Sequence, residues 1–338
     1  MKIITCCSYY GTGSSAVTDY FSEFNNVESL GDYEFRFLHD PDGVRDLEYN
    51  LVENFNRHNS GHALKRFKRL VDYYGNHFLT KRYEPFFNNQ WKIISYKYID
   101  RLTDFRYKGS WQYDYYDRGS FFEFWHKLPG RFLKKTIWRK SPDKSYSSLK
   151  NEITYCSNPT KEQFLRITKE YLAELFEVAS KQGKEYLMID QLFPSSNINH
   201  FLDYIEDVFV FVVDRDPRDV YISYKYLYPN SIVPSNVEDF CKWYRYCRSS
   251  RKTENWNSNH VLFVQFEDLI YKYKETTTAI CSFLGVREAN HVRPFTFFNP
   301  EKSKNNTRLW TKYSKYKQEI DIIEKSLSEY LYYYGGEQ

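Results

Sequence analysis

The N-terminal segment of this chain reads Ile3-Ile4-Thr5-Cys6-Cys7-Ser8-Tyr9-Tyr10-Gly11-Thr12-Gly13-Ser14-Ser15-Ala16. Its first five residues form a short apolar run bounded by a turn, which predicts a buried strand. Apolar side chains then recur at helical spacing, at Val17, Tyr20, Phe21 and Phe24. A strand, a glycine turn and a helix start leave backbone N–H groups free to bind an anion. The segment therefore predicts a site for a phosphate-type group, and the alternative is a plain turn with a serine cap.

Two common phosphate loops fit this segment poorly. A P-loop requires G-x-x-x-x-G-K-[ST], and no lysine follows Gly13. The pattern Gly11-x-Gly13-x-x-Ala16 fits the dinucleotide fingerprint, which also needs a second strand and an acid about 20 residues further on. Asp32 offers the acid, but residues 25–30 predict only a poor strand. A third kind of loop is suggested by the second half of the chain.

Length and cysteine usage limit the class of protein. With 338 residues, the chain can bury a sizeable core as one large domain or as one domain with an insertion. Six cysteines form no CxxC pair and no Cys/His metal spacing, which predicts reduced thiols and no metal site. We also expect no signal peptide and no transmembrane segment, and therefore a cytoplasmic protein.

Positive charge is concentrated in one part of the chain. The net charge is only +4, but residues 57–140 carry 19 Lys/Arg against 7 Asp/Glu, a local +12 that leaves −8 for the remainder. A basic segment of this size favours an anionic partner. The alternative is a set of solvated helix faces, and residues 62–78 do show an apolar stripe backed by lysine and arginine.

Residues 60–158 differ in character from the rest of the chain. Their pattern is helical and irregular, with no strand of the central-sheet type. Aromatic residues crowd there, at Trp91, Trp111, Tyr113, Tyr115, Tyr116, Phe121, Phe122, Phe124, Trp125 and Trp138. Some of these rings must be core. Others are candidates to stack on a sugar or to enclose a flat apolar ring.

From Thr160 onward, strands and helices alternate. Thr160 and Gln163 form a predicted capping box at the start of a helix. Apolar runs at residues 186–189, 208–213 and 261–266 predict strands, and the second run is apolar throughout, as in a strand covered on both faces. Such alternation predicts an α/β fold with a parallel sheet and right-handed crossovers.

A second informative segment reads Val213-Asp214-Arg215-Asp216-Pro217-Arg218-Asp219-Val220-Tyr221-Ile222-Ser223. Asp216 and Pro217 predict a helix start directly after a strand. Arg215 then lies at the carboxyl end of that strand, where open α/β sheets bind ligands, and Ser223 lies about two turns into the helix. Together they suit a second phosphate group. The alternative is that Arg215 merely pairs with Asp219.

These segments resemble the nucleotide-binding motifs of the cytosolic sulfotransferase superfamily, in a divergent, bacterial-type form. Its members use 3′-phosphoadenosine 5′-phosphosulfate (PAPS). The loop Tyr10-Gly11-Thr12-Gly13-Ser14-Ser15 resembles the family's 5′-phosphosulfate loop, and Arg215 with Ser223 resembles its 3′-phosphate motif. Residues 266–269 resemble the "YEDL" stretch. Residues 302–310, with Lys304 and Arg308, resemble the basic loop that closes over the nucleotide.

The resemblance implies one sulfotransferase domain over residues 1–338. The expected fold has three layers, a central parallel sheet with helices on both faces, and residues 60–158 form a mainly helical insertion on the acceptor side. The implied reaction is transfer of a sulfuryl group from PAPS to an alcohol hydroxyl, with release of adenosine 3′,5′-bisphosphate. The implied acceptor is a glycan or a small apolar alcohol such as a sterol. No metal and no nucleic acid take part.

The chain departs from the family pattern at two places. Many members have a lysine where this loop has Gly11, so hydroxyls, Lys304, Arg308 or a lysine of the insertion are the candidates to replace it. Many members also have a histidine base after the strand preceding the 3′-phosphate motif, and Asp190 stands there. Asp190 is therefore the candidate catalytic base, and the alternative is a purely structural carboxylate.

Two other functions compete with sulfotransfer. A nucleotide-dependent oxidoreductase or kinase could use the same glycine turn, although the weak second strand and the missing Gly-Lys pair argue against both. A non-enzymatic protein that binds anionic glycans or phosphate would also explain the basic segment.

Overall fold

The computed structural model describes residues 1–75, 82–141, 143–144, 146–226, 228 and 232–335. These residues form two compact units. The first comprises residues 1–40, 86–88 and 172–338, and the second comprises residues 41–85 and 89–171. The segment expected as an insertion, residues 60–158, lies almost wholly in the second unit.

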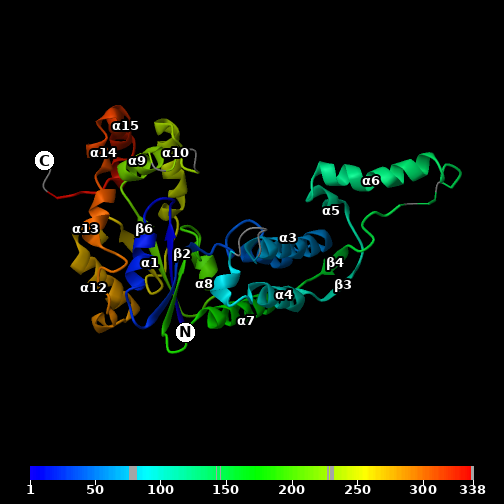
Figure 1. The fold of residues 1–338 in the computed structure, drawn as a ribbon, viewed down its shortest axis with the longest axis horizontal. Coiled ribbons are helices and arrows are strands. Elements are labelled where there is room, and N and C mark those ends of the chain that lie inside the picture. Colours follow the sequence, from blue (N-terminus) through cyan, green and yellow to red (C-terminus); the bar gives the residue numbers. More distant parts are fainter. Residues whose placement is uncertain (76–81, 142, 145, 227, 229–231, 336–338) are drawn as a thin grey trace. The chain divides into compact units, whose positions relative to one another are not determined.

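Five parallel strands form the central sheet of the first unit (Figure 1). They are β1 (Lys2–Ser8), β2 (Val27–Glu34), β5 (Tyr186–Asp190), β6 (Val208–Asp214) and β7 (Val261–Gln265). Their order across the sheet is β2-β5-β1-β6-β7. The structure thus contains the strands expected near residues 3–7, 186–189, 208–213 and 261–266, and it confirms the α/β fold with a parallel sheet.

The register of the sheet brings three strand ends together. In β1, Cys6 is the partner of Asp190 at the end of β5, and Ser8 is the partner of Val213 near the end of β6. Because parallel strands point the same way, the loops that follow them emerge at one edge of the sheet, where ligands of α/β proteins bind. The two predicted phosphate motifs follow β1 and β6.

Both faces of the sheet are covered. On one face, Ile4 and Cys6 of β1 belong to a core cluster that also contains residues of α1 and α12. The alternate residues Ile3 and Cys7 are equally buried, so the opposite face is covered as well. Covered faces on both sides explain the continuous apolar runs of the central strands. The fold therefore has the expected three layers.

The helices of the first unit are short. They are α1 (Ser15–Phe21), α8 (Ile198–Leu202), α9 (Pro217–Tyr226), α10 (Val237–Cys247), α11 (Asp268–Tyr271), α12 (Tyr273–Leu284), α13 (Pro300–Ser303), α14 (Leu309–Lys312) and α15 (Lys317–Ser326). Gly285 ends α12 with a φ of +71°, the left-handed conformation usual after a helix. A second core cluster joins α9, α10 and α15.

One sequence interpretation was wrong. Residues 25–30 predicted a poor strand, yet β2 runs along the edge of the sheet and pairs with β5. An edge strand pairs with a neighbouring strand on one side only, and its other side is more exposed. Its sequence can therefore include residues such as Glu28, Gly31 and Asp32. The position of β2 still argues against the dinucleotide fold, because there the second strand lies beside the first. Here β5 separates β2 from β1.

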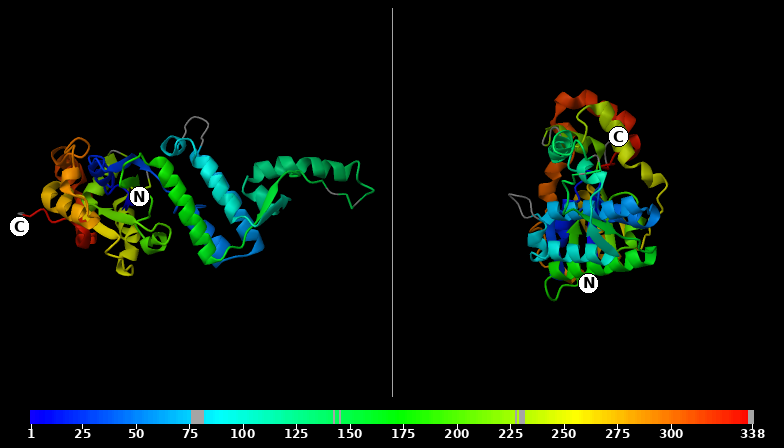
Figure 2. Two further views of the ribbon diagram at one scale, coloured as in Figure 1. Left: turned by 90° about the horizontal axis from the view of Figure 1, so that it is seen from below. Right: turned by 90° about the vertical axis from the view of Figure 1, so that its right-hand side faces the viewer.

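The second unit is mainly helical (Figure 2). Its elements are α2 (Val44–Glu48), α3 (Arg57–Gly75), α4 (Trp91–Leu102), β3 (Phe105–Lys108), α5 (Gln112–Tyr116), α6 (Ser120–Lys135), β4 (Ile153–Cys156) and most of α7 (Lys161–Ala179). Strands β3 and β4 form a separate antiparallel pair, which the sequence did not predict. Thr160 and Gln163 exchange the two hydrogen bonds of the expected capping box.

Aromatic side chains build the core of this second unit. The indole N–H of Trp91 donates to the carbonyl of Val71 at 3.0 Å, which joins α4 to α3. The rings of Tyr98 and Tyr171 stack with 4.2 Å between their centroids. The apolar stripe expected over residues 62–78 contributes Phe67 to this core, whereas Phe78 lies outside the described residues.

Candidate active site

The loop after β1 requires glycine at two positions. Tyr10, Gly11 and Gly13 have positive φ angles of 67°, 71° and 88°. A Cβ atom on Gly11 would lie 2.1 Å from the ring of Tyr224, and one on Gly13 would lie 2.5 Å from the ring of Phe266. Backbone conformation and lack of space thus both exclude a side chain. Tyr10 keeps its side chain 43% exposed.

Thr12 ties this loop to the end of β6. Its hydroxyl is fully buried and donates to the carbonyl of Val213 at 2.6 Å. The backbone N–H of Tyr9 donates to the same hydroxyl at 3.3 Å. Because the Thr12 hydroxyl is used in this way, it holds the loop against the neighbouring strand.

Arg215 brings three predicted segments together. Its Nη1 donates to the carbonyl of Gly11 at 3.1 Å, and its Nη2 donates to the hydroxyl of Ser223 at 3.2 Å. Nη2 also donates to the carbonyl of Asn306 in the C-terminal segment. The guanidinium carbon lies 5.1 Å from the ring centroid of Phe266. One buried side chain therefore contacts the first loop, the second motif and the expected basic loop.

Asp219 fixes the C-terminal segment to α9. Its carboxylate accepts hydrogen bonds from the backbone N–H groups of Arg308, at 3.0 Å, and Leu309, at 2.7 Å. Burial raises the pKa of Asp219 to about 7, although the nearby Arg215 opposes this shift. Asp219 therefore binds backbone N–H groups and forms no ion pair with Arg215. The Arg215 side chain hydrogen-bonds to Gly11, Ser223 and Asn306. At the helix start, Asp216 accepts from the N–H of Arg218 at 2.8 Å, as expected of a cap.

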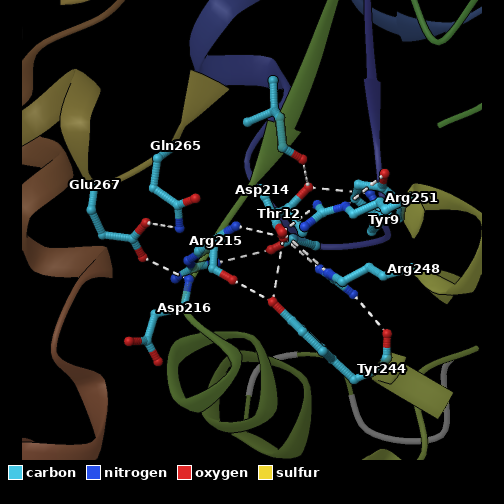
Figure 3. Close-up of polar contacts among 12 residues, drawn as sticks. Tyr9, Thr12, Asp214, Arg215, Asp216, Tyr244, Arg248, Arg251, Gln265 and Glu267 are labelled. Carbon is cyan, nitrogen blue, oxygen red and sulfur yellow. Dashed lines mark hydrogen bonds and ion pairs between the residues drawn. The ribbon is translucent and has the colours of Figure 1, made fainter. Parts of the chain in front are cut away.

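A buried network braces the end of β6 (Figure 3). Asp214 accepts from Nη2 of Arg248 at 2.5 Å and also from Arg251. These two arginines hold the pKa of Asp214 below its usual range, against the opposing effect of burial. Tyr244 donates to the carbonyl of Arg215 at 2.7 Å, and Arg251 donates to the hydroxyl of Tyr9 at 3.0 Å. The network thus holds Arg215 and the first loop in register.

Glu267 lies beneath the start of α9. Its carboxylate accepts from the backbone N–H of Asp216 at 2.9 Å and from the side chain of Gln265 at 3.0 Å. Burial raises the pKa of Glu267 to about 8. The stretch that resembles "YEDL" therefore has a definite structural task, because it positions the helix start next to Arg215.

Asp190 lies in the interior at the end of β5. The thiol of Cys6 donates to its carboxylate at 2.8 Å, and burial raises the pKa of Asp190 to about 7. The next residue, Gln191, has a φ of +55° and turns its amide toward the first loop. That amide donates to the hydroxyls of Ser14, at 2.8 Å, and Ser8, at 3.1 Å. Gln191, which the sequence did not single out, contacts the loop directly.

The remaining predicted residues lie further out. Lys304 pairs through its Nζ with both carboxylate oxygens of Glu301, at 2.7 and 2.8 Å. The guanidinium carbon of Arg308 lies 5.4 Å from the ring centroid of Tyr334. Ser15 is exposed at the start of α1. The structure therefore groups the first loop with Arg215 and Ser223, and it does not place the Lys304 side chain in that group.

No group of three or more His, Cys, Asp or Glu side chains in the described part of the chain is arranged to hold a metal ion. None of the helices formed by these residues is both long and apolar enough to cross a membrane.

Comparison with a family model connects the second motif to known proteins. Residues 206–330 match the model described as the sulfotransferase domain. This match confirms the predicted relationship to the sulfotransferase superfamily. The matched range contains Arg215, Ser223, Lys304 and Arg308, whereas the first loop and Asp190 precede it.

Solved sulfotransferase structures were also compared with the whole chain. Sulfotransferase STF1 from Mycobacterium tuberculosis H37Rv is 11% identical, over 91% of this chain and 76% of its own, with a TM-score of 0.34. The sulfotransferase domain of the Synechococcus PCC 7002 olefin synthase is 15% identical, over 90% and 86%, with a TM-score of 0.38. Sulfotransferase STF9 from Mycobacterium avium is 12% identical, over 92% and 76%, with a TM-score of 0.36. A comparison with curated protein sequences gives no match.

Within the matched residues 206–330, several contacting residues carried no recognisable signal in the sequence. Tyr224 limits the space beside Gly11, and Arg248 and Arg251 bind Asp214. These residues are far from their partners along the chain and follow no motif spacing. A motif can be read from sequence, but the side chains that pack around it become apparent only in the fold.

Proposed function

We propose that this chain transfers a sulfuryl group from PAPS to the hydroxyl of an acceptor and releases adenosine 3′,5′-bisphosphate. The observation that carries the proposal is the position of Arg215. Its side chain contacts Gly11 of the first loop and Ser223 of the second motif, although more than 200 residues separate the two segments in sequence. A nucleotide with phosphate groups at both ends of its ribose needs two anion sites held in fixed register.

The residues present fit such a nucleotide. The Nε atom of Arg215 is buried and has no hydrogen-bond partner among the described residues, so a cationic donor is left for a ligand. We assign the 3′-phosphate to Arg215 and Ser223, because a guanidinium fork and a hydroxyl suit a phosphate group. We assign the 5′-phosphosulfate to the loop from Tyr10 to Ser15, which leads from β1 into the start of α1.

The protein's contribution to the reaction is positioning and neutralisation of charge. PAPS supplies an activated sulfuryl group, which an acceptor hydroxyl attacks in line. Rate enhancement then comes from holding the reacting groups and from stabilising charge that develops on the leaving oxygen. Gly11 occupies the position of the usual lysine, so we propose that Lys304, Arg308, loop hydroxyls or a lysine of residues 60–158 take this task. For Lys304, the contact with Glu301 must first break.

The acceptor and its base complete the proposal. We propose that residues 60–158, rich in aromatic and basic side chains, form the acceptor side and receive a glycan or a small apolar alcohol such as a sterol. Asp190 is proposed as the base that removes the hydroxyl proton. With a pKa of about 7, a substantial fraction of this carboxyl group is ionised at neutral pH.

Calorimetric titration with adenosine 3′,5′-bisphosphate, ATP and NAD tests the nucleotide assignment. We expect micromolar binding of the bisphosphate alone. Arg215→Ala should weaken it by about 1.5–3 kcal/mol and Ser223→Ala by about 1 kcal/mol, because a charged hydrogen bond is worth more than a neutral one. Arg287→Ala, which removes an exposed arginine of the same unit, is the matched control. Preference for ATP or NAD, or unchanged affinity in both site variants, would contradict the assignment.

Transfer itself is tested with sulfur-labelled PAPS. Soluble oligosaccharides and sterols are offered in parallel, and label is sought in the acceptor. Incorporation that disappears in the Arg215→Ala variant supports sulfotransfer. Tight bisphosphate binding without incorporation into either class of acceptor would contradict the proposed acceptors while leaving the nucleotide site intact.

A further inference from the structure

Helix α6 presents an apolar face to solvent. Five side chains on this face are exposed, among them Phe121 at 79%, Trp125 at 53% and Phe132 at 64%. The others are Phe124 and Leu128. They recur at intervals of three, four and seven residues, so they share one stripe along the helix. No residue of this helix is buried in the structure.

Positive charge is concentrated in α6 and in the five residues that follow it. Residues 120–140 contain six Lys or Arg and a single acid, Glu123, which gives a net charge of +5. Glu123 is already paired with Lys127. At helical spacing, Lys127 and Lys134 lie roughly 120–140° around the helix axis from the middle of the aromatic stripe, whereas Arg131 flanks the stripe and Lys135 falls within it.

A third face attaches α6 to its own unit. The ring of Phe122 stacks on His126 and lies 6.4 Å from the ring of Tyr115 in α5, centroid to centroid. Gly130 lies against Tyr146, because a Cβ there would come within 3.1 Å of that residue. Figure 1 shows α5 and α6 next to each other. The packing face and the apolar stripe are therefore different surfaces.

We propose that α6 lies in the plane of an anionic membrane surface and inserts its aromatic stripe among the lipids. A helix with Phe, Trp and Leu on one face and Lys and Arg on the other is typical of interfacial membrane helices. Sixteen residues with several charges are too few and too polar to span a bilayer. The helix thus binds the surface without crossing it.

Charge is the reason to prefer lipid over a second copy of this chain. Two copies that met through α6 would bring together two segments with a net charge of +5 each, which repel. An anionic bilayer offers negative headgroups to the cations and an apolar interior to the aromatic rings. This inference does not depend on the nucleotide site, because it rests only on α6 and its flanks, which lie within the segment proposed as the acceptor side.

Vesicle binding tests the inference with the full chain. One set of vesicles contains equal parts phosphatidylglycerol and phosphatidylcholine, and the other contains phosphatidylcholine alone. Flotation should recover the protein with the anionic vesicles only, and added salt should weaken binding because it screens the lysines and arginines. Equal binding to both vesicles, or to neither, would overturn the proposal.

Two double variants separate the contributions of apolar and charged side chains. Phe121→Ser with Trp125→Ser should weaken vesicle binding about tenfold for each side chain removed. Lys134→Gln with Lys135→Gln should weaken it roughly fivefold for each charge. The matched controls are Ile93→Ser, an apolar residue 67% exposed on α4, and Lys161→Gln, an exposed lysine of α7, and both should bind like the wild type. If only the charge variant loses binding, insertion of the stripe is refuted.

Two further measurements exclude other occupants of the stripe. Without lipid, the aromatic double variant should keep the thermal midpoint and the sedimentation coefficient of the wild type. A lower midpoint would mean that the stripe packs within the chain, and a change from dimer to monomer would mean that it binds a second copy. Either result overturns the proposal. If the aromatic double variant does not fold, the quenching of tryptophan fluorescence by brominated lipids is compared between the wild type and Trp125→Phe. Insertion of the stripe predicts less quenching in Trp125→Phe, and equal quenching would overturn the proposal.

Discussion

Asp190 is a buried carboxyl group whose ionisation is opposed by its surroundings. Its pKa of about 7 lies well above the usual value near 3.9, first because of burial and also because Glu34 and Asp32 are near. Between these two pH values the folded protein binds more protons than the unfolded chain. The stability that Asp190 contributes is therefore complete below about pH 4 and is lost as the pH rises to about 7.

The first prediction compares the wild type with the Asp190→Asn variant across this pH range. Relative to the variant, the wild type should lose roughly 4 kcal/mol of unfolding free energy between about pH 4 and pH 7, since each pKa unit is worth 1.36 kcal/mol. Urea denaturation at several pH values measures the difference. If Asp190 is also the base, turnover in the variant should fall about 10²–10⁴-fold with little change in bisphosphate affinity. A constant difference across the range, or near-normal turnover, would contradict the respective assignment.

Asp214 is different, because two arginines stabilise its charge. Removing the carboxylate charge would leave Arg248 buried without its anion, so Asp214→Asn should reduce the unfolding free energy by about 3–5 kcal/mol. The matched control is Asp239→Asn, which breaks an exposed pair with Lys242 and should cost at most about 1 kcal/mol. Urea denaturation of both variants measures the contrast. Equal losses would show that the buried network contributes no more than a surface pair.

Among the elements, the C-terminal segment at residues 304–309 depends on contacts to other parts of the chain. Its carbonyl at Asn306 accepts from Arg215, and its N–H groups at Arg308 and Leu309 donate to Asp219. The segment itself contains only short helical turns, which have little stability of their own. Its order is therefore set by α9 and by the end of β6.

The corresponding prediction is made for Asp219→Ala. Loss of the acceptor for two N–H groups should favour local opening by about 1–3 kcal/mol, so trypsin should cleave after Lys304, Arg308 or Lys312 at least several-fold faster. Cleavage in α12, at Lys274, should not change. Asp239→Ala, which alters an exposed carboxylate of α10, is the control. Equal acceleration at all sites would instead indicate global destabilisation.

The sequence predicted those strands in which almost every residue is buried, because such strands read as continuous apolar runs. β6 is apolar throughout because both of its faces are covered, and its residues 208–213 therefore identify it as a strand. β2 has a single neighbour and a polar sequence, so its pairing with β5 depends on residues more than 150 positions away. The β3–β4 pair is short and lies at the surface, and nothing in its local pattern indicates a partner.

The same division applies to the candidate site. Gly11, Gly13 and Arg215 stand in motifs whose local spacing indicates phosphate binding. Gln191 reaches the loop only because β5 neighbours β1, and Arg251 reaches Tyr9 only because the end of α10 packs near β6. Side chains that act across strands have no spacing to detect. Their roles follow from sheet order, which a single sequence does not specify.

At the level of the whole molecule, each compact unit has an aromatic core of its own. In the second unit, Phe67 packs edge-on against Tyr98 with 5.7 Å between ring centroids. In the first, Phe211 packs against Phe21 and Phe283 at 5.3 and 5.6 Å. Separate cores allow separate unfolding, because a unit that buries its own apolar surface can open without exposing the other.

The last prediction therefore concerns how stability is distributed. Both Phe67 and Phe211 are fully buried, and truncation of either to alanine should cost about 3–5 kcal/mol. Native-state hydrogen exchange should show this loss in α3 and α4 for Phe67→Ala, with β1 and β6 affected by less than half as much. Phe211→Ala should give the reverse pattern. If both variants lower protection equally in the two units, the chain unfolds as one cooperative body. In that case, bisphosphate bound to the first unit should slow hydrogen exchange in α3 of the second unit as much as in β1 of the first.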